Sequence, residues 1–153
     1  MSRTTIQETP KAERIPPLPS HHFEDHPGEV KVGIRAESLR ELFAEAGSAL
    51  GELLLEDPET ATATSEWERC ALRAADRETL LAAWVNELIY LSETRHVVYT
   101  EFRIDRLTDT ELLASARGVP TEQIRTAVKA ATFHELSVRE VADGYEAHVV
   151  LDV

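Results

Sequence analysis

Two acidic groups at the end of the chain have the residue types and spacing that could do chemistry. Residues 145–153 follow Asp143 and Gly144, a pair that favours a tight two-residue turn, so they are predicted to form the return strand of a hairpin. Alternation along that strand places Asp152 on its polar side, one residue before the α-carboxylate of Val153. Two carboxylates held at a strand end repel each other unless a cation or hydrogen-bond donors compensate. Asp152 and Val153 are therefore candidate cation ligands.

A third candidate ligand is Glu29, which lies on the polar side of a strand predicted over residues 30–36. Calcium and magnesium both take oxygen ligands, and two or three carboxylates with water suit either ion. Acidic residues at strand ends are more often only solvated. The hypothesis is thus a hard-metal site formed by Glu29, Asp152 and Val153, with a solvated strand end as the simpler alternative.

Three histidines precede these carboxylates. His21, His22 and His26 could bind a metal, but Pro27 and Gly28 argue against a helix that would gather them. No cysteine lies nearby to complete a familiar zinc spacing. We therefore expect exposed loop histidines.

Two further polar residues lie in the last third of the chain. His134, beside Phe133, could act as a catalytic base, although a hydrogen-bonded histidine within a sheet is the favoured interpretation. Lys129 is expected to share a strand face with Arg125 and Ala127, where it could pair with a carboxylate. A surface ion pair contributes only about 0–1 kcal/mol, so stability alone gives Lys129 little importance.

The composition bounds the class of protein. The chain has 153 residues, of which 42% are hydrophobic and 29% charged, which is typical of one soluble globular domain. It has no apolar run of the roughly 20 residues needed to cross a bilayer, and no signal-peptide hydrophobic region, so we expect no membrane association. Its single cysteine, Cys70, fits a reducing cytoplasm. Its net charge of −12 argues against strong direct nucleic-acid binding and favours a protein partner or a cation.

Hydrophobic patterning predicts two amphipathic helices. Ser38 and Glu41 form a capping box that opens the first, and Asp76 is the expected N-cap of the second. Strands are expected over residues 30–36 and 67–74, near 98–104 and 112–116, and over 124–131, 132–141 and 145–153. Cys70 is expected to be a small buried hydrophobe.

These elements predict an α+β fold. The two helices would pack on a largely antiparallel or mixed β-sheet, or on a pair of sheets, in a single domain that ends in a strand. Residues 1–20 contain several prolines and little periodicity, and are predicted to be a disordered or loosely packed extension. The domain would then span residues 21–153.

Five segments of the chain form an ordered set of motifs: residues 26–30 with 38–43, 84–91, 99–102, 128–136 and 150–153. Together they resemble the archease family, the small activators of RtcB-type RNA ligases. The clearest is Trp84-Val-Asn-Glu-Leu-Ile-Tyr-Leu91, which is similar to the family's Trp-Leu-Asn-Glu-Leu-Leu-Tyr-Leu. None of them is a catalytic signature, but their order and spacing are specific.

The resemblance implies an archease-like domain that is a non-catalytic partner protein. It would promote guanylylation and repeated turnover of the ligase in tRNA splicing and RNA repair. It further implies a divalent cation, calcium or alternatively magnesium, held by Glu29, Asp152 and Val153. Lys129, with His134 and His26, would then be candidate contacts with the ligase.

The chain departs from the family pattern in one ligand, because Glu29 stands where the family has Asp. Two alternatives therefore remain open. One is a small metal-dependent hydrolase that uses Asp152, Glu29 and His134. The other is a diverged interaction protein that has lost the ion.

Overall fold

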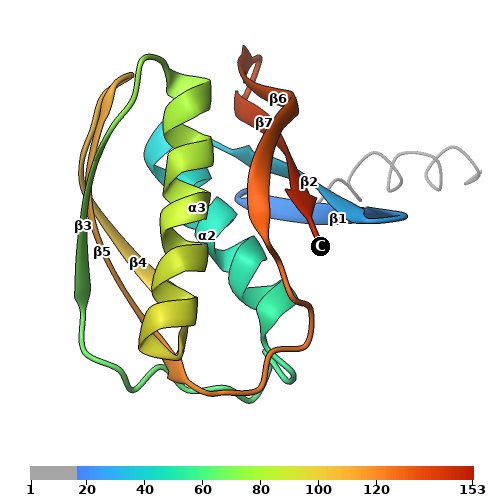
Figure 1. Ribbon diagram of the computed structural model, residues 1–153. Helices are drawn as coiled ribbons and strands as arrows, with labels where there is room; N and C mark the ends of the chain where they lie inside the picture. Colours follow the sequence, from blue (N-terminus) through green and yellow to red (C-terminus); the bar gives the residue numbers. More distant parts are fainter. Residues whose placement is uncertain (1–16) are drawn as a thin grey trace, which may run out of the picture.

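Two antiparallel sheets enclose two helices in the computed structural model, which describes residues 17–153 (Figure 1). The elements in chain order are β1 (Ser20–His26), β2 (Glu29–Ala36), α2 (Leu39–Leu54), β3 (Glu68–Arg73), α3 (Arg77–Arg95), β4 (Val97–Leu107), β5 (Glu111–Pro120), β6 (Ala130–Val141) and β7 (Gly144–Asp152). The predicted α+β class is confirmed, and the helices pack on a pair of sheets.

The layers follow from the strand pairing. The four-stranded sheet has the order β1-β2-β7-β6, and the three-stranded sheet has the order β3-β5-β4. Every pairing between these described strands is antiparallel, so no mixed sheet is present among them. Helix α2 contacts β4 and β2, while α3 contacts β6 and β4, so both helices bridge the two sheets.

Both predicted helix starts are confirmed. The hydroxyl of Ser38 accepts a hydrogen bond of 3.1 Å from the N–H of Glu41, and Asp76 accepts one of 2.8 Å from the N–H of Thr79. The carboxylate of Glu41 reaches back to the N–H of Glu37, one residue before the usual capping-box partner. Local side-chain chemistry therefore sets where each helix begins.

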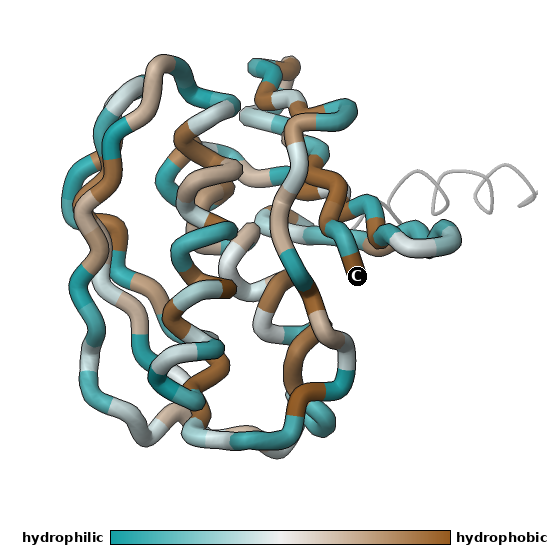
Figure 2. The backbone as a smooth tube through the Cα atoms, viewed as in Figure 1, coloured by the Kyte–Doolittle hydropathy of each residue, from teal (hydrophilic) through white to brown (hydrophobic). Residues whose placement is uncertain are grey.

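The core lies around Trp84 of α3, which is fully buried. Its indole N–H donates to the carbonyl oxygen of Phe43 at 2.8 Å, and its ring meets Phe102 edge-on at 5.9 Å. Gly47 of α2 lies against the same Phe102, since a Cβ there would come within 2.6 Å of the ring. Figure 2 shows hydrophobic and hydrophilic residues alternating along the strands, which have one face on this core.

Cys70 is also buried, as predicted, on the inner side of β3. Burial raises the pKa of its thiol to about 11, so it remains protonated at neutral pH. It is therefore a packing residue with low nucleophilic reactivity.

Two predictions of secondary structure were wrong. Residues 20–26, expected to be a loop, form strand β1, an edge strand whose inner face carries few apolar residues. The strand expected over 124–131 is absent: Ile124 makes a single bridge to Leu55, and β6 begins at Ala130. Arg125 instead donates its main-chain N–H to Leu54 and its guanidinium to Glu52, satisfying carbonyl groups at the end of α2.

Ser20, expected in the extension, pairs with Arg35 and so belongs to the four-stranded sheet. Residues 1–16 of the predicted extension lie outside the described residues. Among residues 17–153, neither helix is long and apolar enough to cross a membrane.

Candidate carboxylate and histidine site

The polar residues of interest lie on the outer face of the four-stranded sheet, the face turned away from the helices. Val30, Val32 and Ile34 of β2 are buried, so Glu29, Lys31 and Gly33 point outward between them. Three rows cross the sheet on this face: His26, Glu29, Asp152 and Ala130; Glu24, Lys31, Val150 and Thr132; His22, Gly33, His148 and Ser137.

The first row brings the candidate metal ligands together. Glu29 is paired directly with Asp152, which places their side chains beside each other on the same face. The N–H of Val153 donates to the carbonyl oxygen of Gly28 at 3.1 Å, and that of Lys129 donates to the carbonyl oxygen of Asp152 at 2.8 Å. The end of β7 is therefore held on both sides, next to the turn between β1 and β2.

The donor set suits a hard cation, because it consists of carboxylate oxygens. Among residues 17–153, no group of three His, Cys, Asp or Glu side chains is placed to hold a metal ion. Glu29 and Asp152 would thus need a further donor, which the carboxylate of Val153 or water could supply. The residues fit calcium or magnesium in type, and a zinc site of histidines and cysteines is not formed by the described residues.

The main chain of Lys129 lies beside the pair formed by Glu29 and Asp152. Its side chain is exposed, and it makes no ion pair among the described residues, so the predicted pairing with a carboxylate is not seen. Its ammonium group is therefore free of a carboxylate partner among residues 17–153.

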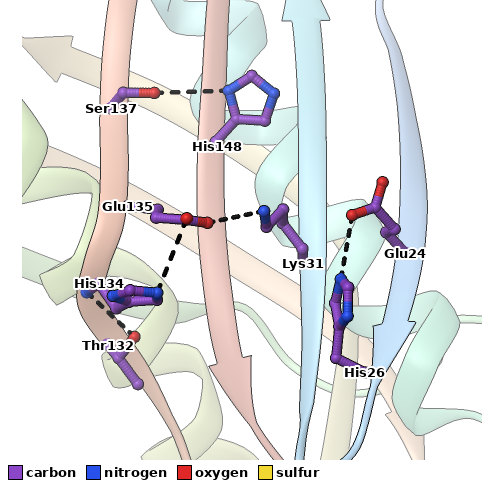
Figure 3. Close-up of polar contacts among 8 residues, drawn as sticks. All are labelled: Glu24, His26, Lys31, Thr132, His134, Glu135, Ser137 and His148. Atoms are coloured by element: carbon purple, nitrogen blue, oxygen red, sulfur yellow. Dashed lines mark hydrogen bonds and ion pairs between the residues drawn. The ribbon is translucent and has the colours of Figure 1, made fainter.

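The histidines occupy three different environments, and the prediction of exposed loop histidines was wrong because all three lie on β1. His26 is exposed, as expected, and pairs with Glu24 at 3.1 Å; this hydrogen bond lowers the pKa of Glu24 (Figure 3). The ring of His22 covers Gly33 and leaves no room for a Cβ at that position. On the other side of Gly33, His148 lies 3.5 Å from the hydroxyl of Ser137.

His21 points inward, toward α2. One ring nitrogen lies 2.6 Å from Glu45 and the other 2.9 Å from Glu52. The hydrogen bond with Glu45 is the main cause that raises the pKa of His21, and burial opposes it. His21 therefore fastens the edge strand to helix α2.

A bulge in β6 carries the remaining candidate, His134. The pairing between β6 and β7 is interrupted between Thr132 and Ser137. The main-chain N–H of His134 donates to the hydroxyl of Thr132, whereas its imidazole is exposed and lies 3.8 Å from Glu135. His134 was predicted to be a hydrogen-bonded histidine within the sheet. Its main chain makes such a hydrogen bond, but its imidazole does not.

Glu135, in the same bulge, has a positive φ of 55° and pairs with Lys31 at 2.7 Å (Figure 3). The pairing lowers the pKa of Glu135 and raises that of Lys31. Because β7 lies between β2 and β6, this ion pair spans β7. Val150 of β7, which faces the same side, is only 1% exposed.

An open hollow of about 380 Å³ lies beside this ion pair. Its lining residues are His22, Glu24, Lys31, Gly33, Glu135 and His148. Our sequence interpretation did not find this hollow, although alternation along β2 and β7 places Lys31 and His148 on the polar side. Glu135 could not have been placed, because only the bulge directs it toward Lys31.

The fold and the outer face define a small α+β protein whose carboxylates and histidines are presented on a sheet that ends with the chain. The chain belongs to the Archease protein family (MTH1598/TM1083), whose model matches residues 21–153.

Curated relatives agree with this assignment. An archease of Methanosarcina barkeri is 28% identical over 141 residues, covering 87% of this chain and 95% of the relative. An archease of Archaeoglobus fulgidus is 27% identical over 137 residues, covering 87% and 98%.

Two solved structures have a similar fold. The solution structure of Methanobacterium thermoautotrophicum protein 1598 superposes with a TM-score of 0.72 at 26% identity, covering 87% of this chain and 98% of that one. A crystal structure of an archease from Thermotoga maritima, described as a possible chaperone, gives a TM-score of 0.59 at 23% identity, covering 90% and 97%. The second likeness supports the fold alone.

Proposed function

We propose that this protein activates an RtcB-type RNA ligase in tRNA splicing and RNA repair, promoting guanylylation of the ligase and its repeated turnover. The observation that carries the proposal is the direct pairing of Glu29 with Asp152 in a member of the archease family. The role is that of a partner protein acting in the cytoplasm, and the chemistry takes place on the ligase.

The proposal includes a divalent cation, calcium or alternatively magnesium. Glu29, Asp152 and Val153 would hold it, and it would supply positive charge at the end of the sheet. Glu29 keeps the charge of the family's Asp but is one methylene longer, which its place opposite Asp152 on the neighbouring strand can accommodate.

Lys129, His26 and His134 are the proposed contacts with the ligase. Lys129 adjoins the carboxylates through its bond to Asp152, and His26 lies opposite Glu29. His134 is exposed on the bulge next to Phe133, a 68% exposed ring that could enter a pocket on the partner. His26 lies on the β1 side of the carboxylate pair, whereas Lys129 and His134 lie on the β6 side, so the proposed contacts flank the candidate site.

The test measures guanylylation and multiple turnover of the cognate ligase with this protein at substoichiometric amounts. We expect acceleration by the wild-type protein and its loss in Asp152→Asn. The control is Asp25→Asn, which removes an exposed carboxylate that pairs with Val30 and so alternates onto the face of the sheet opposite Glu29. No acceleration by the wild-type protein would rule out the function, and full activity of Asp152→Asn would remove that carboxylate from it.

An assay of the protein without the ligase distinguishes the hydrolase alternative from the proposed function. Turnover of phosphoester substrates by the protein without any ligase would favour it. We expect none, because His134 lies in the bulge of β6, outside the row that pairs Glu29 with Asp152.

A further inference from the structure

The outer face of the three-stranded sheet carries a cluster of arginines. This sheet lies on the opposite side of the helices from the four-stranded sheet, which carries the carboxylates (Figure 1). Its members are Arg69 and Arg73 of β3, Arg103 and Arg106 of β4, and Arg117 of β5. These three strands hold five arginines against four acidic residues, whereas the whole chain holds 16 basic residues against 28 acidic ones. The positive charge is thus concentrated on one face of an acidic protein.

Two of these arginines are not neutralised. Arg73 and Arg106 share Glu111, and Arg117 pairs with Glu101. Arg69 and Arg103, by contrast, have no carboxylate partner among the described residues. Both are paired with Ser115 of the central strand, so the three residues form a single row across the outer face of the sheet.

An aromatic ring lies at the edge of this cluster. The guanidinium of Arg103 lies 3.9 Å from the ring centre of Trp67, and that of Arg117 lies 5.0 Å from it. Trp67 is partly exposed, unlike the fully buried Trp84. A guanidinium on an indole is a cation–π contact that keeps the cation close to the ring.

We propose that this face binds a short segment of single-stranded nucleic acid, with Arg69 and Arg103 holding a phosphate over Ser115 and a base stacking at Trp67. Guanidinium forks match phosphate oxygens, and the cluster contains no lysine. Proteins that bind single strands without sequence preference combine cations that contact the phosphate backbone with aromatic rings on which bases stack. This face has both features. An acidic protein segment would need the arginines but not the ring.

The net charge of −12 argued against strong direct binding of nucleic acid, and this proposal revises that expectation. Electrostatic interactions are screened beyond about 8 Å at physiological ionic strength, so a bound strand senses the local cluster more than the distant acidic surface. The choice of RNA over DNA rests on the proposed function. The binding of a single strand rests on the arginines and Trp67 and does not depend on the proposed function. Because the helices separate the two sheets, RNA and a ligase could be bound at the same time (Figure 1).

The experiment is fluorescence anisotropy of a labelled oligouridylate of about ten nucleotides, titrated with the full chain at low and at physiological salt. We expect saturable binding that weakens with salt. Arg69→Ala with Arg103→Ala, and separately Trp67→Leu, should each weaken binding about tenfold. The matched control is Arg35→Ala with Arg139→Ala, two arginines of the other sheet that already pair with Asp143 and Glu146.

Circular dichroism checks that each variant is folded. Absence of saturable binding by the wild-type protein, or an equal loss in the control pair, would overturn the proposal. So would a polyglutamate peptide that binds as tightly as the oligouridylate and is unaffected by Trp67→Leu, since the face would then suit an acidic protein. An oligodeoxyuridylate bound as tightly as the RNA supports the phosphate-and-stacking site and overturns only the preference for RNA.

The same variants separate this proposal from the ligase hypothesis. Guanylylation as proposed modifies the ligase itself, so variants of Arg69, Arg103 and Trp67 should retain that activation. Failure of RNA binding with activation intact would refute this inference alone.

Discussion

Glu29 and Asp152 face each other across β2 and β7, although 122 residues lie between them in the chain. Neighbouring strands are about 4.8 Å apart, so the two carboxylates repel each other unless a cation or donors compensate. The bonds from Val153 to Gly28 and from Lys129 to Asp152 hold the main chain in this arrangement. The backbone therefore holds two acidic residues side by side at the end of the sheet, which is the arrangement that the proposed cation site needs.

Asp152→Asn should weaken calcium binding at least tenfold, because one of the two paired carboxylates loses its charge. Calorimetric titration measures this directly. A ligand present at about 100 times its dissociation constant stabilises a protein by about 2.7 kcal/mol, so calcium should also raise the melting temperature of the wild-type protein and of Asp25→Asn more than that of Asp152→Asn. Asp25→Asn is the control, and equal calcium affinity of all three proteins would refute the site.

His21 should make stability depend on pH. Its folded-state pKa is raised above the ordinary histidine value of 6.5, so the stabilisation is fully present below pH 6.5 and is lost as pH rises through the raised pKa. His21→Gln should therefore cost about 1 kcal/mol at pH 6 and less at pH 9, because only protonated His21 donates to both Glu45 and Glu52. Urea unfolding at both pH values measures this difference.

His22→Gln serves as the comparison, because His22 lies on the same strand but on the outer face. A destabilisation by His21→Gln that is the same at every pH would show that the contact acts by packing alone.

Gly47→Ala should destabilise the protein by about 1–3 kcal/mol, although alanine is the better helix former. The added Cβ would meet the ring of Phe102, which is itself packed against Trp84. Ser48→Ala, at the next position of α2, tests helix propensity without this clash. If Gly47→Ala proves as stable as the wild type in thermal unfolding, the ring has room to move.

Glu135→Gly should melt a few degrees above Glu135→Ala. Both substitutions remove the ion pair with Lys31, but only glycine adopts the positive φ of 55° without strain. Differential scanning calorimetry compares the two variants. Equal melting temperatures would mean that the bulge relaxes to another conformation when the carboxylate is removed.

Much of the fold is local in origin and was predictable from the chain alone. Strands β2 and β7 follow from alternation, and both helices begin at the expected caps, Ser38 and Asp76. These signals depend on residues within a few positions of each other, because backbone geometry sets the period of each element. The resemblance to the archease family likewise rested on short ordered segments.

Long-range contacts decided the remainder. Strand β1 has little apolar alternation and forms because it pairs with the edge of β2. Arg125, which was predicted to lie in a strand, instead donates hydrogen bonds to carbonyl groups of α2. Loops and edge strands take their conformation from partners far away in sequence, so no local pattern specifies them.

The sequence by itself determined which residues could bind a cation or carry charge, because residue type sets ligand chemistry. Only the tertiary structure decided which of them meet. Strand register placed Glu29 opposite Asp152, and a bulge in β6 directed Glu135 across β7 to Lys31. Pairing of β3 and β4 with β5 placed Arg69 and Arg103 in one row with Ser115. Positive charge is therefore concentrated on one face, which the net charge of −12 does not indicate.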